Sequence, residues 1–127
     1  LANKKHGRLT VSIQGDGDLM CCPSSLWTAA HEKIPILYIM HNNRAWHQEI
    51  MLLQQVANRM QRGIDRTHIG TTIRDPFIDF SKMAQSMGVH GQGPITDPKD
   101  LGAAIKRAVD VVKRGEPALI DVVCQGR

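Results

Sequence analysis

The sequence predicts an α/β fold in which a parallel sheet carries helices on both faces. Short strand-like segments occur at residues 9–13, 36–40 and 118–123, and stretches with helical spacing of apolar residues separate them. Strands that alternate with helices along a chain are typical of parallel sheets. With 127 residues the chain is expected to form one domain, spanning residues 1–127, or part of one.

The first half of the chain predicts two strands, each followed by a polar loop. Residues 9–13 alternate apolar and polar side chains, as a short strand does, and lead into a loop at 14–18. Pro23 suits the start of a helix, where its missing N–H is tolerated. The continuously apolar segment 36–40 is typical of a strand covered on both faces, and residues 41–45 form the second loop.

The middle of the chain predicts two helices joined by a long surface loop. Apolar residues recur at helical spacing over residues 49–62, and Gly63 can end that helix. Residues 63–76 have no clear period and are expected to form the loop. Residues 78–87 form a short helix that ends at Gly88, and a further strand can follow it before the last helix.

The last third gives the clearest pattern. Asp97 is a suitable N-cap, Pro98 a suitable first helical residue, and Gly115 a suitable residue just beyond the C-terminus of the helix. The apolar residues between them fall on one stripe: Leu101, Ala104, Ile105, Ala108, Val109 and Val112. Residues 118–123 then form the closing strand.

Composition argues against several classes of partner and location. The net charge of +4 comes from scattered basic residues, without zinc-finger spacing or interleaved aromatic residues, so nucleic-acid binding is not expected. The three cysteines form no disulfide framework, which favours a reducing, cytoplasmic compartment. The sequence has no apolar run near the roughly 18 residues that span a membrane.

Both polar loops follow predicted strands, and ligands of parallel α/β sheets bind at these carboxyl ends. Gly15 and Gly17 permit a tight turn and close approach of the backbone to a ligand. The next helix favours an anion such as phosphate at its N-terminus. Asp16 would repel a phosphate unless a divalent cation joined them, and Mg²⁺ commonly binds one or two protein oxygens together with phosphate oxygens.

Asn42 and Asn43, at the end of the next strand, supply amide oxygens of the kind that Mg²⁺ binds. Gly15-Asp16-Gly17 alone is a weak signal, but here 24 residues, 18–41, separate it from the Asn pair. An alternative is a simple Asx turn at each loop. Such turns would not require matched positions at two strand ends, so the metal–diphosphate interpretation is preferred.

The paired motif resembles the signature of thiamine-diphosphate enzymes, in which Gly-Asp-Gly precedes Asn-Asn by somewhat over twenty residues. The resemblance to acetolactate synthases and benzoylformate decarboxylases covers essentially the whole chain. It includes residues 25–30, the Ile34-Pro35 pair, residues 79–84, the Gly88-Val89 pair and residues 115–122. These motifs are specific for the cofactor and carry little information on the substrate.

The resemblance implies thiamine diphosphate and Mg²⁺ as cofactors. The metal ligands would be the side chains of Asp16 and Asn43 and the backbone carbonyl of Ala45. The residues implied in cofactor binding are Gly15, Asp16, Gly17, Asp18, Leu19 and Asn43, of which Gly17, Asp18 and Leu19 line the diphosphate. Arg44 and Trp46 replace smaller residues that are common in the family.

Glu49 lies six residues after Asn43, where some decarboxylases of the family place an acidic group near the reacting carbon. It could act as a catalytic proton donor if burial raised its pKa. The simpler interpretation is a glutamate in the first turn of the 49–62 helix, where the helix dipole favours it. The simpler interpretation is preferred.

The resemblance implies a lyase or transferase that acts on a small 2-keto acid through the cofactor ylide. An acetolactate synthase-like activity is the first expectation, and a benzoylformate-type decarboxylase the second. A non-catalytic assembly module of the same fold is a third alternative. A nicotinamide-binding domain is disfavoured because Met20 stands where its motif requires glycine.

The resemblance also implies that part of the functional unit lies elsewhere. In the family, another domain supplies the glutamate that activates the pyrimidine ring, and an apolar residue well upstream bends the cofactor. Only 14 residues precede Gly15. The chain is therefore expected to be a fragment or one subunit, inactive alone, that associates with the missing pyrimidine-binding part or with itself as a dimer or tetramer.

Overall fold

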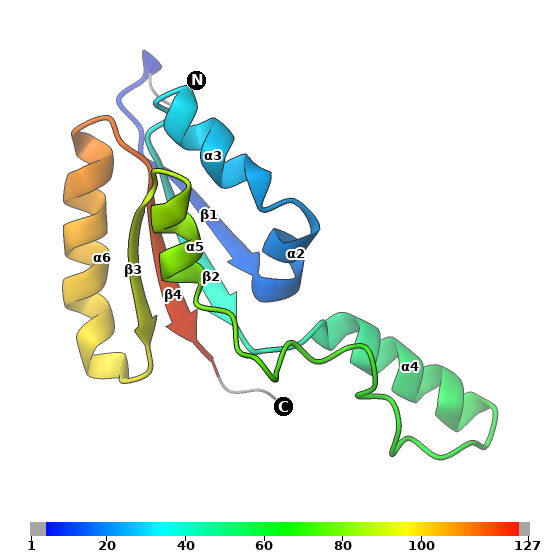
Figure 1. Cartoon of the computed structure of the whole chain (residues 1–127). Helices are drawn as coiled ribbons and strands as arrows, with labels where there is room; N and C mark the ends of the chain where they lie inside the picture. The colour runs from blue at the N-terminus through cyan, green and yellow to red at the C-terminus, as the bar shows by residue number, and fades with distance from the viewer. Residues whose placement is uncertain (1–4, 125–127) are drawn as a thin grey trace.

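The computed structural model describes residues 5–124, which form one parallel four-stranded sheet with helices on both faces (Figure 1). The fold class is as predicted. The strands are β1 (Thr10–Gly15), β2 (Ile36–Asn42), β3 (His90–Ile95) and β4 (Ala118–Val123), in the sheet order β1-β2-β4-β3. The helices are α2 (Asp16–Cys21), α3 (Ser24–His31), α4 (His47–Arg59), α5 (Phe80–Ser86) and α6 (Pro98–Lys113).

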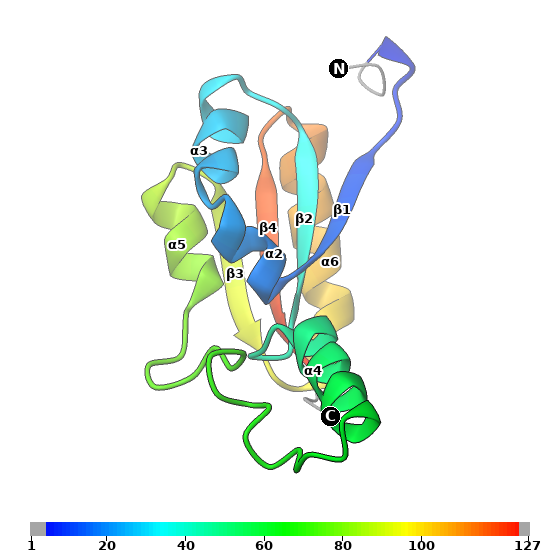
Figure 2. The ribbon, with the colours of Figure 1, turned by 90° about the vertical axis from the view of Figure 1, so that its right-hand side faces the viewer.

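The sheet separates two apolar cores. Helices α2, α3 and α5 cover one face and α6 covers the other (Figure 2). Successive residues of a strand point to opposite faces, so Leu119 of β4 enters the first core and Ile120 the second. The central strands β2 and β4 are therefore covered on both sides, as the continuous apolar sequence of residues 36–40 predicts for β2.

The predicted helix boundaries of the last third are confirmed. The Asp97 side chain accepts a hydrogen bond from the Lys99 N–H at 2.9 Å and caps α6, with Pro98 as the first helical residue. Gly115 has φ of +98°, the left-handed conformation expected just beyond a helix C-terminus. Asp79 caps α5 in the same way, accepting from the Lys82 N–H at 2.9 Å.

The prediction of a loop at residues 14–18 is wrong. Strand β1 continues to Gly15, and α2 begins at Asp16 without an intervening loop. Asp16 and Asp18 both lie in the first turn, where the helix dipole favours carboxylates, and Asp18 Oδ2 accepts a hydrogen bond from the Gly15 N–H at 3.3 Å. β2 likewise extends through Asn42, so that Gly15 pairs with His41 at the end of the sheet.

Helix α4 projects beyond the carboxyl ends of the strands and has no buried residue (Figures 1 and 2). The predicted helix is present, but its apolar side chains stay exposed instead of packing on the sheet. Those on α4 are Met51, Leu52, Leu53 and Val56. The edge strand β1 also exposes apolar side chains, with Ile13 at 74%. In residues 5–124, the structure contains no helix long and apolar enough to span a membrane.

Replacing leucine by alanine should lower the free energy of unfolding by very different amounts in the core and on α4. Leu119 is fully buried, so Leu119→Ala is expected to lower the free energy of unfolding by about 2–5 kcal/mol. Leu52 is 60% exposed, and Leu52→Ala should change it by no more than about 0.5 kcal/mol. Urea unfolding of the two variants measures both values. Equal costs would contradict this assignment of the core.

Candidate functional site

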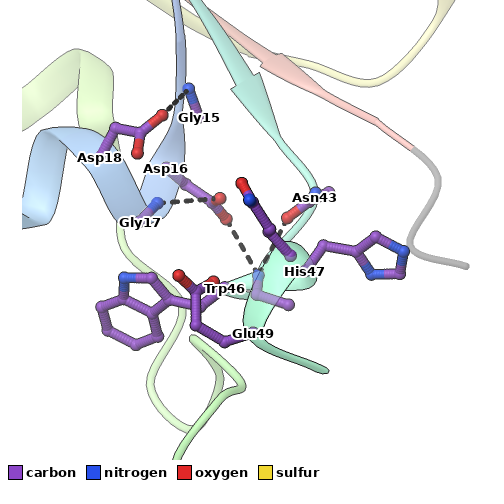
Figure 3. A pocket seen from close by; sticks show the side chains of 10 residues that line it. Gly15, Asp16, Gly17, Asp18, Asn43, Trp46, His47 and Glu49 are labelled. Atoms are coloured by element: carbon purple, nitrogen blue, oxygen red, sulfur yellow. Dashed lines mark hydrogen bonds between the residues drawn. The ribbon is translucent and has the colours of Figure 1, made fainter. Parts of the chain in front are cut away.

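A cavity of about 160 Å³ lies where the carboxyl ends of β1 and β2 meet the start of α4 (Figure 3). The two segments singled out in the sequence come together here. The residues lining the cavity are Gly15, Asp16, Gly17, Asp18, Asn43, Ala45, Trp46, His47, Gln48 and Glu49.

The carboxylate of Asp16 is the most buried charged group of this cavity, with an exposed fraction of 1%. Its Oδ1 accepts a hydrogen bond from the Gly17 N–H at 3.0 Å, and its Oδ2 accepts one from the Ala45 N–H at 3.2 Å (Figure 3). Burial raises the pKa of Asp16, and the backbone donors oppose that rise. No basic side chain within residues 5–124 forms an ion pair with it.

Asn43 belongs to the same hydrogen-bonded group. Its Oδ1 accepts from the Ala45 N–H at 3.1 Å, so this N–H is shared between the oxygens of Asn43 and Asp16 (Figure 3). An Asx turn is therefore present at this loop, as the simpler interpretation required. The turn does not exclude a metal role, because it brings the amide oxygen and the buried carboxylate to one N–H.

The segment 71–73 orients the backbone of Ala45. Ala45 and Thr72 form an isolated antiparallel bridge, in which the Trp46 N–H donates to the Thr71 carbonyl and the Ile73 N–H donates to the Arg44 carbonyl, both at 2.8 Å. In such a bridge the flanking residues make the hydrogen bonds, and the groups of the central residue point away. The N–H of Ala45 accordingly points to Asp16, and its carbonyl faces away from Thr72.

This bridge predicts different amide exchange rates for two adjacent residues. The Ile73 N–H is bonded to the Arg44 carbonyl, whereas the bridge directs the Thr72 N–H away from residues 44–46. The Ile73 amide should exchange at least about tenfold more slowly than the Thr72 amide, after correction for intrinsic rates. Amide hydrogen exchange followed by NMR tests this. Equal protection would show that the bridge does not persist in solution.

Asn42 does not line the cavity. The expectation that both asparagines supply oxygen ligands for a metal ion is therefore wrong for this residue. Its Nδ2 donates to Asp121 Oδ1 at 2.9 Å, and Asp121 Oδ2 accepts from the Phe80 N–H at 3.2 Å. Asp121 is fully buried in β4. It connects the end of β2 to the start of α5. The sequence signal for this connecting role was that Asp121 is a single acidic residue within an otherwise apolar strand.

Burial raises the pKa of the Asp121 carboxyl, and the neighbouring carboxylates of Asp79 and Asp16 raise it further. Its hydrogen bonds oppose this rise. Because the folded-state pKa lies above the unfolded value of about 3.9, protonation stabilises the fold. That contribution is fully present below the unfolded pKa and is lost as the pH rises through the folded pKa.

Asp121→Asn should therefore cost more stability in acid than at neutral pH. Asparagine does not ionise, and it places an N–H₂ group against one of the two donors that Asp121 accepts from. The expected loss is about 1–3 kcal/mol near pH 4, decreasing toward about pH 7 as the wild-type carboxyl ionises. Urea unfolding of both proteins across this range measures the difference. A loss independent of pH would contradict the raised pKa.

The remaining predicted site residues are divided between the cavity and the core. Gly15, Gly17 and Asp18 line the cavity, whereas the Leu19 side chain is buried in the first core and leaves only its backbone for a ligand. Glu49 lies in the first turn of α4, exposed and at the cavity wall. Trp46, His47 and Gln48 also line the cavity and were not predicted as site residues. Their signal in the sequence was that they are the three residues after Ala45.

The donor set fits Mg²⁺ held jointly with a phosphate-bearing ligand. It combines one carboxylate, one amide oxygen and one backbone carbonyl, all hard oxygens. Residues 5–124 contain no group of three or more His, Cys, Asp or Glu side chains able to hold a metal ion. The site therefore suits a cation that completes its coordination with phosphate oxygens and water, and Asp16 is the buried charge it would neutralise.

Fold and site thus define a diphosphate-binding α/β domain, and sequence comparison identifies its family. Residues 1–122 match the family described as thiamine pyrophosphate enzyme, C-terminal TPP binding domain. The chain belongs to this family. Thiamine diphosphate, with Mg²⁺ as its usual partner metal, is accordingly the cofactor of this domain, as the motif predicts.

Two relatives are similar over most of the chain. A Mycobacterium tuberculosis protein with the provisional name acetolactate synthase large subunit IlvX is 29% identical over 116 residues, which are 91% of this chain and 22% of that protein. The thiamine diphosphate-dependent 4-hydroxybenzoylformate decarboxylase of Rhodococcus jostii RHA1 superposes with a TM-score of 0.72 and 26% identity, covering 94% of this chain and 20% of that one. The chain thus spans about a fifth of the length of each.

Proposed function

We propose that this chain supplies the metal and diphosphate half of a thiamine-diphosphate site in an acetolactate synthase-like enzyme acting on 2-keto acids. The observation that carries the proposal is the buried Asp16 carboxylate, which shares the Ala45 N–H with Asn43 and has no basic partner in residues 5–124. The bound cofactor supplies a nucleophilic carbon and an electron sink for decarboxylation.

In this proposal Asp16, Asn43 and the Ala45 carbonyl hold Mg²⁺. Gly15, Gly17, Asp18 and the Leu19 backbone lie along the diphosphate. The cation is essential to the arrangement, because the carboxylates of Asp16 and Asp18 both lie at the cavity and would otherwise repel the diphosphate. The same cation would favour the ionised form of Asp16 and offset the effect of burial on its pKa.

The second candidate is a benzoylformate-type decarboxylase, favoured by the superposition on the 4-hydroxybenzoylformate decarboxylase. The two candidates share the cofactor site and differ in the step after decarboxylation. Release of an aldehyde from an aryl keto acid would identify the decarboxylase. Transfer to a second keto acid would identify the synthase.

We further propose that another part of the enzyme, carrying the pyrimidine-binding region, covers the apolar surface left on α4 and β1. The exposed side chains of Leu52 and Ile13 support this, as does the greater length of the relatives. Binding to a second copy, as a dimer or tetramer, would use the same surface.

Asp16→Asn should abolish Mg²⁺-dependent binding of thiamine diphosphate. The amide keeps the size of the side chain but removes the charge that offsets the cation, and a loss of at least about a hundredfold in affinity is expected. Calorimetric titration of thiamine diphosphate with and without Mg²⁺ measures it. Asp100→Asn is the matched control, since Asp100 also lies in a first helical turn but far from the cavity.

The titration is made first on this chain and then on the longest polypeptide that contains it. Heat that requires Mg²⁺, persists in Asp100→Asn and disappears in Asp16→Asn supports the proposal. If the wild-type protein binds no thiamine diphosphate in either form, the proposed function is wrong.

Glu49→Gln separates the two interpretations of Glu49. If the residue only favours the start of α4, the variant should bind Mg²⁺ and thiamine diphosphate within about twofold of wild type and retain turnover in the assembled enzyme. If Glu49 transfers a proton, turnover should fall by about 10²–10⁴ while binding stays unchanged. Steady-state kinetics on the assembled enzyme, beside the titration, gives both values.

A further inference from the structure

The chain between the proposed metal ligands Asn43 and Ala45 turns at Arg44, in a conformation that is unfavourable for arginine. Arg44 has a φ of +62°, in the left-handed region that favours glycine and asparagine. On either side of this turn, the Asn43 side chain and the Ala45 N–H form a hydrogen bond, and the same N–H donates to Asp16. The geometry of the proposed metal site therefore depends on a backbone conformation that other contacts must stabilise.

The side chain of Arg44 makes one such contact. Its guanidinium carbon lies 4.0 Å from the centre of the Phe77 ring, within the range of a cation–π interaction. Within residues 5–124 Arg44 forms no ion pair, so the ring is the partner that the structure gives to its charge. Phe77 is 56% exposed and belongs to neither apolar core, so core packing does not account for its position.

The backbone of Arg44 contacts the same segment of the chain. Its carbonyl accepts a hydrogen bond from the Ile73 N–H at 2.8 Å, beside the bridge between Ala45 and Thr72. The segment 73–77 thus holds Arg44 through both its backbone and its side chain. The backbone contact is open to any residue at position 44. The side-chain contact requires a cation at position 44 and an aromatic ring at position 77.

Arg44 lies outside the cavity proposed for Mg²⁺ and the diphosphate. Together with Phe77 it lines a second cavity, of about 170 Å³, at the carboxyl ends of β2, β3 and β4. Asp79 also lines this second cavity, but its carboxylate is paired with the Lys82 ammonium at 3.2 Å. Any effect of the Arg44 side chain on the metal site is therefore indirect, through the backbone of residues 43–45.

We propose that Arg44 is a positioning residue, whose cation–π contact with Phe77 keeps Asn43 and Ala45 in the geometry that Mg²⁺ requires. The inference rests on the proposed function, because it concerns the same metal site. Mg²⁺ needs nearly ideal octahedral coordination at short distances, whereas Ca²⁺ accepts longer and more variable coordination. Residues 43–45 without this contact should therefore lose affinity for Mg²⁺ much more than for Ca²⁺.

Simple electrostatics predicts the opposite sign for loss of the Arg44 charge. A guanidinium near the site repels a cation, so removing it should strengthen Mg²⁺ binding if the side chain had no other role. The proposal predicts weaker binding. Arg44→Gln removes the charge and Phe77→Leu removes the ring. The two variants thus delete the same contact, with and without a change in net charge.

Calorimetric titration of Mg²⁺ and, separately, of Ca²⁺ at a fixed concentration of thiamine diphosphate tests the inference, on the longest polypeptide that contains this chain. Arg44→Gln and Phe77→Leu should each weaken Mg²⁺ binding by about three- to tenfold and change Ca²⁺ binding by no more than about twofold. The double variant should bind Mg²⁺ within about twofold of the weaker single variant, because both changes remove one contact.

Arg107→Gln is the matched control. Arg107 lies on α6, and its Nε donates to Gln92 Oε1 at 3.3 Å. It lines neither of the two cavities, so its loss should leave the affinity for both cations within about twofold of wild type. Circular dichroism of each variant shows whether it folds. If Arg44→Gln does not fold, the comparison of Mg²⁺ with Ca²⁺ in Phe77→Leu decides the question.

Four results overturn the inference while leaving the proposed function intact. Tighter Mg²⁺ binding by Arg44→Gln would mean that the guanidinium acts only through its charge. Equal losses for Mg²⁺ and Ca²⁺ would mean that the contact does not set the ligand geometry. Losses that multiply in the double variant would mean that the two side chains act independently, and unchanged affinities that the contact has no bearing on the site. A wild-type protein that binds no Mg²⁺ with thiamine diphosphate overturns the proposed function, and this inference with it.

Discussion

The hydrogen bond from the Ala45 N–H to the buried Asp16 carboxylate is the contact on which the site depends. It joins the ends of two parallel strands that are aligned by the pairing of Gly15 with His41. A buried carboxylate is costly unless hydrogen bonds or charges compensate it, so the backbone around it must be held in place. The bridge to residues 71–73 and the hydrogen bonds that join Asn42, Asp121 and Phe80 each supply part of that support.

A second buried acid makes the electrostatics of the site cooperative. Asp121 lies near enough to Asp16 for the Asp16 carboxylate to raise the pKa of Asp121, and both groups are already disfavoured as ions by burial. Positive charge at Asp16 would therefore oppose the rise in the pKa of Asp121 that the Asp16 carboxylate causes. Asp121 lies too deep to touch a ligand, yet the Asn42 amide connects it to the strand that leads to Asn43. In the proposed function, cofactor binding and the stability of the fold are linked through the charges of Asp16 and Asp121.

The sequence predicted elements and site positions correctly where local signals agree with the tertiary structure. Helix α6 begins at the predicted cap and ends before the predicted glycine, and the spacing of Asp16 and Asn43 correctly placed both at the same edge of the sheet. Helix α2 was missed because glycine residues inside it and directly before it argue for a loop. The orientation of Asn42 depends on where β2 ends, which periodicity alone does not determine.

Strand β3 is a second element that local sequence signals predicted poorly. Its sequence contains two glycines and a proline, a poor strand pattern, and it was anticipated only as an optional element. Gly93 has φ of +131°, and a Cβ there would meet the Asp121 carbonyl oxygen at 2.6 Å. Close approach of β3 to β4 therefore selects glycine over a strand-forming residue. The residue of β3 that looks unfavourable locally is thus explained by the strand that lies against it.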